Sequence, residues 1–197
     1  MGFIDLFPTV IFSKNIKDNN IFSYINFIKN EKFELSGEKN GYYSNNSNIL
    51  NEYIFSNLKQ TILKNVLLYL KEVGHEVEDI QISNSWANVL NKNQEIHNHI
   101  HANSYISGVF YLTESSSIKF NNPLLREENF CATKIFNENN YRTYTEYYIN
   151  PTPGLLLIFP SWLDHSAVSS ETDNRISIAF NIIPKGKFGF PTAQINL

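Results

Sequence analysis

The stretch Glu95-Ile96-His97-Asn98-His99-Ile100-His101 carries three of the five histidines of the chain. Successive side chains of an extended strand point to opposite faces, so this spacing places His97, His99 and His101 on one face. A fourth histidine, His165, follows much later, after a long apolar run. Imidazole is a good ligand for iron, copper, zinc and nickel. The pattern therefore predicts a metal site built on β-strands.

The sequence around these histidines has the periodicity of strands. Apolar side chains alternate through residues 80–90 and 175–183, and residues 105–112 and 155–159 are β-rich runs bounded by turn residues. Several strands with turn signals and without interleaved helices predict an antiparallel sandwich or jelly roll. Gly108 predicts a close approach of another element. Five residues are expected on one face of the strand at residues 80–90: Ile80, Ile82, Trp86, Asn88 and Leu90.

The helical signals lie before these strands. The spacing of apolar residues predicts helices over residues 18–31 and 50–73, and Gly74 is placed to end the second helix. A first strand is expected at residues 9–13, and residues 34–49, rich in Ser, Gly, Asn and Tyr, are expected to form a loop. We expect residues 1–197 to form a single mainly-β domain with these helices packed outside a barrel.

A metal site that binds substrate and oxygen needs three protein ligands and open positions. His99, His101 and His165 supply three. The usual third ligand of non-haem iron oxygenases is a carboxylate. The nearest carboxylates fit poorly, because Glu95 lies at the start of the strand and Asp164 points away from His165 if that segment is extended. For His97 the spacing leaves ligation, a place at the mouth of the pocket and a structural role open.

The strand after His165 carries a second signal. Its alternation places Arg175, Ser177, Ala179 and Asn181 on one face and the apolar residues on the other. A guanidinium beside a hydroxyl suits a bidentate grip on a carboxylate. If a 2-oxo acid chelates the metal, its far carboxylate would lie here. The alternative for Arg175 is a surface ion pair with Asp173 or Glu171.

Polar and aromatic residues near these segments complete the predicted pocket. Asn88 and Asn181 face its interior and are expected to bind the co-substrate or the substrate, or to hydrogen-bond to each other. Tyr111 is also expected to bind the co-substrate. The residues expected to contact substrate are His97, Tyr105 and Trp162. Cys131 has no base nearby in the sequence and is expected to be structural.

The chain also resembles a known group of proteins. The matching pieces are residues 6–9, 86–89, 99–101, 107–112, 154–162, His165 and residues 175–181. It is similar to the 2-oxoglutarate and Fe(II)-dependent oxygenases, and within them to a small family from bacteria and phages. The resemblance implies a double-stranded β-helix, Fe(II) at the histidines, 2-oxoglutarate held by Arg175 with Ser177, and hydroxylation of an unactivated C–H bond. The superfamily motif is HxD…H, and His101 stands here in place of the aspartate.

Composition limits the partners. The net charge of −3 gives no basic patch, which argues against nucleic acid. The single cysteine excludes an internal disulfide framework and fits a reducing cytosol. No apolar run approaches the roughly 20 residues that span a bilayer. We therefore expect a cytoplasmic protein that acts with molecular oxygen on a small molecule or peptide. Unpaired sheet edges would allow a homodimer.

Two other hypotheses compete with the oxygenase. One is a cupin-like metalloenzyme that holds its metal with three histidines and uses no 2-oxo acid. The other is a non-catalytic jelly-roll binding module whose histidines are vestigial or bind zinc. The first predicts that Arg175 is dispensable, and the second predicts that iron is not bound.

Overall fold

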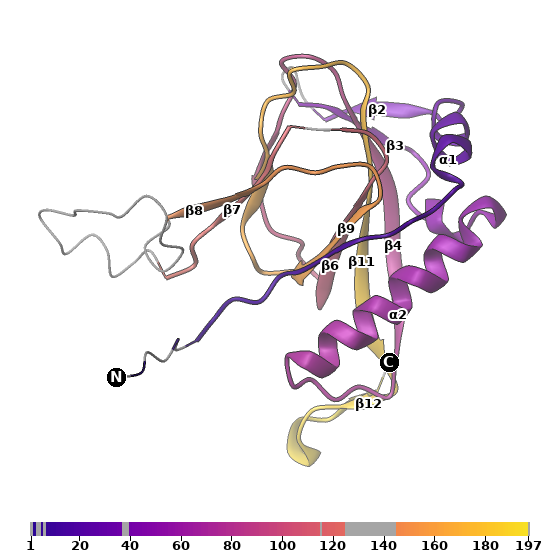
Figure 1. Cartoon of the computed structure of the whole chain (residues 1–197). Helices are drawn as coiled ribbons and strands as arrows, with labels where there is room; N and C mark the ends of the chain where they lie inside the picture. Colours follow the sequence, from indigo (N-terminus) through magenta and orange to yellow (C-terminus); the bar gives the residue numbers. More distant parts are fainter. Residues whose placement is uncertain are drawn as a thin grey trace, which may run out of the picture.

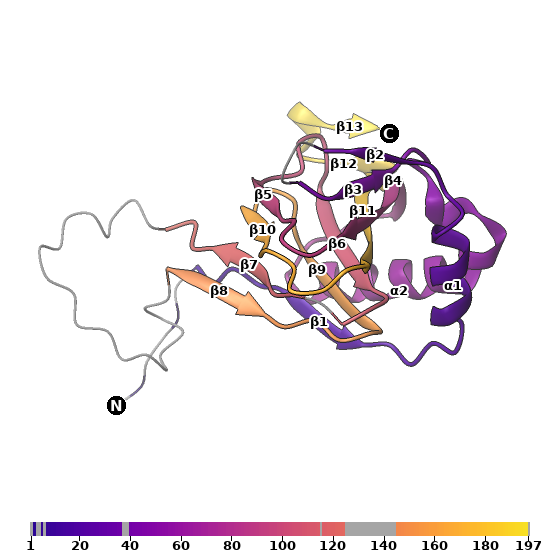
Figure 2. The same ribbon diagram turned by 90° about the horizontal axis from the view of Figure 1, so that it is seen from above.

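The fold consists of three layers. The computed structural model describes residues 2, 5, 7–36, 40–114, 116–124 and 145–196. Two α-helices, α1 (Ile21–Ile28) and α2 (Ser56–Glu72), lie on one side of a seven-stranded sheet. A four-stranded sheet lies on its other side, as the view from above shows (Figures 1 and 2). Neither described helix is long and apolar enough to span a membrane.

The remaining elements are strands and 3-10 turns. The strands are β1 (Phe12–Asn15), β2 (Phe33–Leu35), β3 (Tyr42–Ser44), β4 (Asp79–Leu90), β5 (Ile96–His99), β6 (Ile106–Tyr111), β7 (Ile118–Asn121), β8 (Glu146–Ile149), β9 (Leu155–Pro160), β10 (His165–Ala167), β11 (Arg175–Lys185), β12 (Lys187–Phe188) and β13 (Ile195–Asn196). The 3-10 turns are η1 (Ile49–Asn51), η2 (Tyr53–Phe55) and η5 (Pro191–Ala193).

The strand order is that of a double-stranded β-helix. The larger sheet has the order β1-β9-β6-β11-β4-β3-β2, and the smaller has the order β5-β10-β7-β8. Neighbouring strands in both sheets pair antiparallel. A separate hairpin of β12 and β13 lies near the C-terminus. The double-stranded β-helix implied by the family resemblance is confirmed, and it is one of the two architectures, sandwich or jelly roll, that the alternation predicted.

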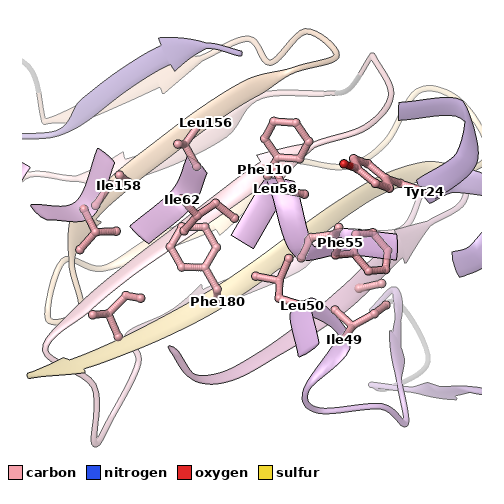
Figure 3. Packing of buried hydrophobic residues seen from close by; sticks show 14 of the residues in the cluster. Tyr24, Ile49, Leu50, Phe55, Leu58, Ile62, Phe110, Leu156, Ile158 and Phe180 are labelled. Carbon is pink, nitrogen blue, oxygen red and sulfur yellow. The ribbon is translucent and has the colours of Figure 1, made fainter. Parts of the chain in front are cut away.

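Strand β11 lies at the centre of the larger sheet and contributes to the main core. Ile176, Ile178, Phe180 and Ile182 all point to the helix side and are at most 1% exposed. They pack against apolar residues of α2 such as Leu58 and Ile62, as Figure 3 shows for part of this cluster. Full burial of each such side chain contributes about 1.5–3 kcal/mol. This packing fixes the face of β11 that is turned toward the helices.

A second, smaller core lies on the other face of the larger sheet. It contains Tyr111 of β6, Leu157 and Phe159 of β9, and Phe120 of β7. Strand β9 contributes to both cores, since Leu156 and Ile158 belong to the helix-side cluster. Residues 155–159 are thus buried on both faces, as predicted from their continuous apolar run.

The shared face predicted for β4 is wrong, because the strand contains a β-bulge. Asn181 of β11 lies opposite Asn84, but the next residue lies opposite Ile82, so Ser83 is an extra residue. Such an insertion reverses the alternation of side chains. Ile80 and Ile82 therefore pack on the helix side, whereas Trp86 and Asn88 line a cavity on the other face.

Other predicted elements shift at their ends or change type. Strand β1 begins three residues after the start of the predicted strand. The predicted loop at residues 34–49 contains most of the β2–β3 hairpin, because β3 pairs with the edge of β4, and it ends at the first residue of η1. The predicted helices shorten to α1 and α2, and η1 and η2 occupy the start of the longer one. Gly74 ends α2 at a φ of 76°, as predicted. Cys131 and residues 141–144 lie outside the described residues.

Gly108→Ala should destabilise the protein. A Cβ at this position would lie 2.3 Å from Cζ of Phe180 and 2.6 Å from the carbonyl oxygen of Leu157. Overpacking of a closed core costs about 1–3 kcal/mol, and urea unfolding should show a loss of this size. Gly2→Ala is the control, because nothing lies within 4 Å of its added Cβ. Equal stabilities of the two variants would show that the core is loose at Gly108.

Candidate metal centre

Three of the predicted ligands converge. His165 of β10 lies directly opposite His99 of β5 in the antiparallel register, and His101 follows two residues after the end of β5. One nitrogen from each of the three rings lies within 4.8 Å of the other two. The ring centroid of His165 is 4.4 Å from that of His99 and 5.1 Å from that of His101. Pairing of β5 with β10 thus joins histidines 66 positions apart in the chain.

Each of these histidines bonds to an oxygen through Nδ1. His99 Nδ1 lies 2.8 Å from the carbonyl oxygen of His97, and His165 Nδ1 lies 2.8 Å from that of Leu163. His101 Nδ1 lies 2.5 Å from Oδ1 of Asn181. A carbonyl oxygen only accepts, so each Nδ1 carries the proton and each Nε2 keeps its lone pair. Metal-binding histidines are oriented in this way.

One pair of these nitrogens has a spacing that suits a shared ion. Nε2 of His99 and Nε2 of His101 are 3.3 Å apart, and one nitrogen of His165 lies within 4.8 Å of this pair. Imidazole nitrogens bind metals at about 2.0–2.1 Å, which separates neighbouring ligands by roughly 2.8–3.4 Å in octahedral or tetrahedral sites. The donor set therefore fits a divalent transition metal.

Burial favours the uncharged form of His165 and His101. It lowers the pKa of His165 to about 3, and the nearby His99 acts in the same direction. Burial also lowers the pKa of His101, although its hydrogen bond to Asn181 acts in the opposite direction. Phe159 contributes to the apolar surroundings, with its ring centroid 4.7 Å from that of His165. Neutral imidazole is the form that binds a metal.

The other candidate ligands lie apart from this cluster. His99, His101 and His165 are the only group of metal-binding side chains among the described residues. Asp164 accepts a hydrogen bond of 2.7 Å from Asn121, and Glu95 lies 3.3 Å from Nδ1 of His97. The side chain of His97 is 64% exposed, and its backbone carbonyl is the part that contacts His99.

The histidines line one cavity together with the inner face of β11. The cavity has a volume of about 340 Å³, at the small end of the range for ligand pockets. The predicted co-substrate residues among its lining are Asn88, Tyr111, Arg175 and Ser177. The alternation predicted for β11 is confirmed, because its apolar residues face the helices while Arg175, Ser177 and Ala179 face the cavity.

Arg175 is a buried cation at this cavity. It is 2% exposed, which contradicts the alternative of a surface ion pair with Asp173 or Glu171. Its guanidinium donates to the carbonyl oxygen of Ser116 over 3.4 Å, and its Cζ lies 5.6 Å from the ring centroid of Tyr111. Burial lowers the pKa of Arg175, and it raises the pKa of Tyr111 to about 12. The phenol therefore stays protonated and able to donate.

Some predicted residues have other surroundings than expected. Asn181 lies outside the cavity lining, and its Oδ1 accepts from His101 and from Ser107. Tyr105 and Trp162 also lie outside the lining. The Tyr105 hydroxyl is 2.7 Å from Nδ1 of His75, and Trp162 is 55% exposed. The substrate contacts expected of Tyr105 and Trp162 are not supported by these positions. His97 does line the cavity.

One wall of the cavity was not predicted from the sequence. The β2–β3 hairpin contributes Ser36, Asn40, Tyr42 and Tyr43. The adjacent tyrosines within a run of Ser, Gly and Asn were the available signal, because aromatic residues favour strands over loops. Ser107 was also missed, since nothing in the sequence pairs it with Asn181.

The fold and this site define a double-stranded β-helix protein with a three-histidine centre. Residues 84–181 match the model of a family described as "Putative 2OG-Fe(II) oxygenase", where 2OG is 2-oxoglutarate. The matched span contains the three histidines, Arg175 and Ser177. Residues 84–181 of the chain therefore belong to the 2-oxoglutarate and Fe(II)-dependent oxygenases, as the resemblance predicted.

Solved structures of this group share the fold. A prolyl-4-hydroxylase from Pseudomonas putida superposes with a TM-score of 0.63 and 11% identity, over 90% of this chain and 94% of that chain. The α-ketoglutarate-dependent epimerase SnoN from nogalamycin biosynthesis superposes with a TM-score of 0.67 and 10% identity, over 91% of this chain and 80% of that chain. HygX from Streptomyces hygroscopicus, with iron bound, superposes with a TM-score of 0.58 and 14% identity, over 89% of this chain and 82% of that chain. No curated protein matches the chain in sequence.

The three histidines should bind one divalent ion in solution. Anaerobic titration of the apo-protein with Co(II) should produce visible absorption at one equivalent. His99→Ala should weaken binding by more than about 100-fold, because loss of a ligand costs more than loss of its hydrogen-bond partner. His97→Ala is the matched control and should bind normally, since only its backbone carbonyl contacts His99. Equal losses in both variants would contradict the ligand set.

Proposed function

We propose that the protein hydroxylates an unactivated C–H bond of a small molecule or peptide, using Fe(II), 2-oxoglutarate and molecular oxygen. The observation that carries the proposal is one cavity lined by both the histidine cluster and the buried Arg175. Fe(II) and 2-oxoglutarate, expected from the sequence, are also the two cofactors named in the family description. A single active domain, a cytoplasmic location and a homodimer stay predictions.

The histidines would hold the metal through Nε2. Their Nδ1 atoms are committed to the oxygens of His97, Leu163 and Asn181, so the rings are already oriented. A preorganised set of ligands avoids the entropic cost of ordering three side chains at binding. When bound, Fe(II) would supply the oxidising chemistry by which the substrate, 2-oxoglutarate and oxygen are converted to hydroxylated substrate, succinate and CO2.

Arg175, Ser177 and Tyr111 would hold the far carboxylate of 2-oxoglutarate. A guanidinium that is 2% exposed has lost most of its hydration, so an anion that reaches it gains a strong charge-assisted hydrogen bond. Ser177 is 2% exposed and follows Arg175 on the same face of β11. Tyr111 lies directly opposite Ser177 in the register of β6 with β11, and its protonated phenol adds a donor.

The remaining wall favours an uncharged group of the substrate. Arg175 is the only Lys, Arg, Asp or Glu among the described residues that line the cavity. The rest of the described wall instead carries aromatic and amide side chains, including Tyr42, Trp86, Asn40 and Asn98. Among these described side chains a charged group would lose hydration without gaining a partner of opposite charge, once the co-substrate occupies Arg175. His97 at the mouth is a further candidate contact.

The proposal differs from the two alternatives in its use of Arg175. A cupin-like enzyme without a 2-oxo acid gives no role to a buried cation in the cavity. A non-catalytic module, whose histidines are vestigial or bind zinc, gives no role to a buried cation beside them either. Family membership also favours the oxygenase.

Removal of the cation should separate co-substrate binding from metal binding. In an anaerobic titration, Fe(II) followed by 2-oxoglutarate should give the weak visible charge-transfer band of the chelate. Arg175→Met should raise the Kd for 2-oxoglutarate at least about 30-fold, since truncating one partner of a buried charge pair costs 2 kcal/mol or more. Its affinity for Fe(II) alone should be unchanged.

Lys119→Met is the matched control for that variant. Lys119 pairs with Glu146 over 2.9 Å in the smaller sheet, outside the cavity lining, so its loss should leave both affinities unchanged. Iron binding without a 2-oxoglutarate band in the parent protein would favour the cupin-like alternative. Failure to bind iron would favour the non-catalytic module.

Succinate release should test the expected charge of the substrate. We expect pools of peptides and small molecules that present neutral aliphatic, amide or hydroxyl groups to stimulate turnover of 2-oxoglutarate. Pools that present only carboxylates, phosphates or ammonium groups should leave turnover at its basal level. A matched pair of peptides that differ by Gln against Glu at one position gives the sharpest comparison. Preference for the charged member would contradict the assignment.

A further inference from the structure

We infer that Asn181 and Ser107 select the tautomer of His101, and thereby make this histidine able to serve as the third metal ligand. The metal-binding half of this inference rests on the proposed function, whereas the choice of tautomer concerns the chain alone. Asn181 is a positioning residue in this account, because it acts through His101.

Asn181 and His101 come from different parts of the fold. Asn181 belongs to β11 and is 8% exposed, while His101 lies in the connection that follows β5. Oδ1 of Asn181 is 2.5 Å from Nδ1 of His101 and 2.8 Å from Oγ of Ser107. Ser107 is fully buried and lies directly opposite Asn181 in the pairing of β6 with β11. One amide oxygen thus contacts two side chains.

Hydrogen-bond donors determine which end of the amide faces His101. Ser104 Oγ donates to the carbonyl oxygen of Ile106 over 2.8 Å, so its proton is used there. The Ser107 hydroxyl can then donate to Ser104 Oγ at 3.4 Å or to Asn181 Oδ1 at 2.8 Å. The shorter contact is the stronger bond. Ser107 therefore favours the amide orientation in which the oxygen faces both residues.

The opposite orientation of the amide would prevent His101 from binding a metal through Nε2. With Nδ2 in place of Oδ1, the amide would donate to Nδ1 of His101, and the neutral imidazole would carry its proton on Nε2. That nitrogen faces Nε2 of His99 at 3.3 Å. A protonated Nε2 has no lone pair for a metal, so the orientation of one amide decides whether His101 is a ligand.

The other two histidines do not need such a device. Their Nδ1 atoms bond to backbone carbonyls two residues earlier in the chain, at His97 and Leu163. A backbone carbonyl cannot exchange its acceptor for a donor. His101 instead relies on a side chain from the opposite sheet, and that side chain has both an acceptor end and a donor end.

Nitrogen NMR of the metal-free protein tests the inference. Long-range 1H–15N correlations at pH 8 report which ring nitrogen of His101 is protonated. We expect Nδ1–H in the parent protein and in Asn181→Asp, whose carboxylate can only accept. Asn181→Leu should increase the share of the Nε2–H form, and Ser107→Ala should do so to a smaller extent. Ser85→Ala, a buried serine that bonds to the backbone of Leu50, is the control and should change nothing.

Metal affinity gives the second readout. Asn181→Leu should weaken Co(II) binding about 10- to 100-fold, the range for loss of a ligand's hydrogen-bond partner, while Asn181→Asp should retain it. An unchanged His101 tautomer in a folded Asn181→Leu would overturn the inference. If that variant fails to fold, an unchanged tautomer in Ser107→Ala would overturn it. Absence of metal binding in the parent protein would contradict the proposed function but leave the tautomer result readable.

Discussion

The alternation of side chains along β11 is the constraint on which the rest of the structure depends. Residues such as Ile178 and Phe180 must point to the helices, because they form the centre of the main core. The residues between them, including Arg175 and Ser177, must then point to the smaller sheet. One strand therefore anchors the helix layer and positions a buried cation at the cavity. A shift of its register by one residue would exchange the two faces and destroy both.

Pairing of strands within the smaller sheet brings the histidines of the site together. The register of β10 with β5 brings His165 to His99, and the end of β5 frees the next residues to turn His101 toward them. Orientation of the rings then depends on three oxygen acceptors, of which the amide of Asn181 is the one supplied by the larger sheet. The metal centre is thus held from both sheets, so its geometry depends on how they pack together.

Sequence periodicity could predict the elements with a regular repeat. The strand character of β11, the long helix ended by Gly74 and the histidine cluster all follow from repeats of two or about 3.6 residues. The bulge at Ser83 could not be predicted, because an inserted residue leaves no local signal in the sequence. It places Trp86 on the face opposite to Ile80 and Ile82. The role of Asn181 was hidden as well, since its partners lie 74 and 80 positions away. Long-range pairing, rather than composition, determines such contacts.

A crystal structure grown anaerobically with Fe(II) and 2-oxoglutarate would test the central claim most directly. The account predicts one iron bound by Nε2 of His99, His101 and His165, with the far carboxylate of 2-oxoglutarate at Arg175. It also predicts that Nδ1 of His101 still contacts Asn181. Iron bound without His101, or a co-substrate carboxylate away from Arg175, would contradict the account.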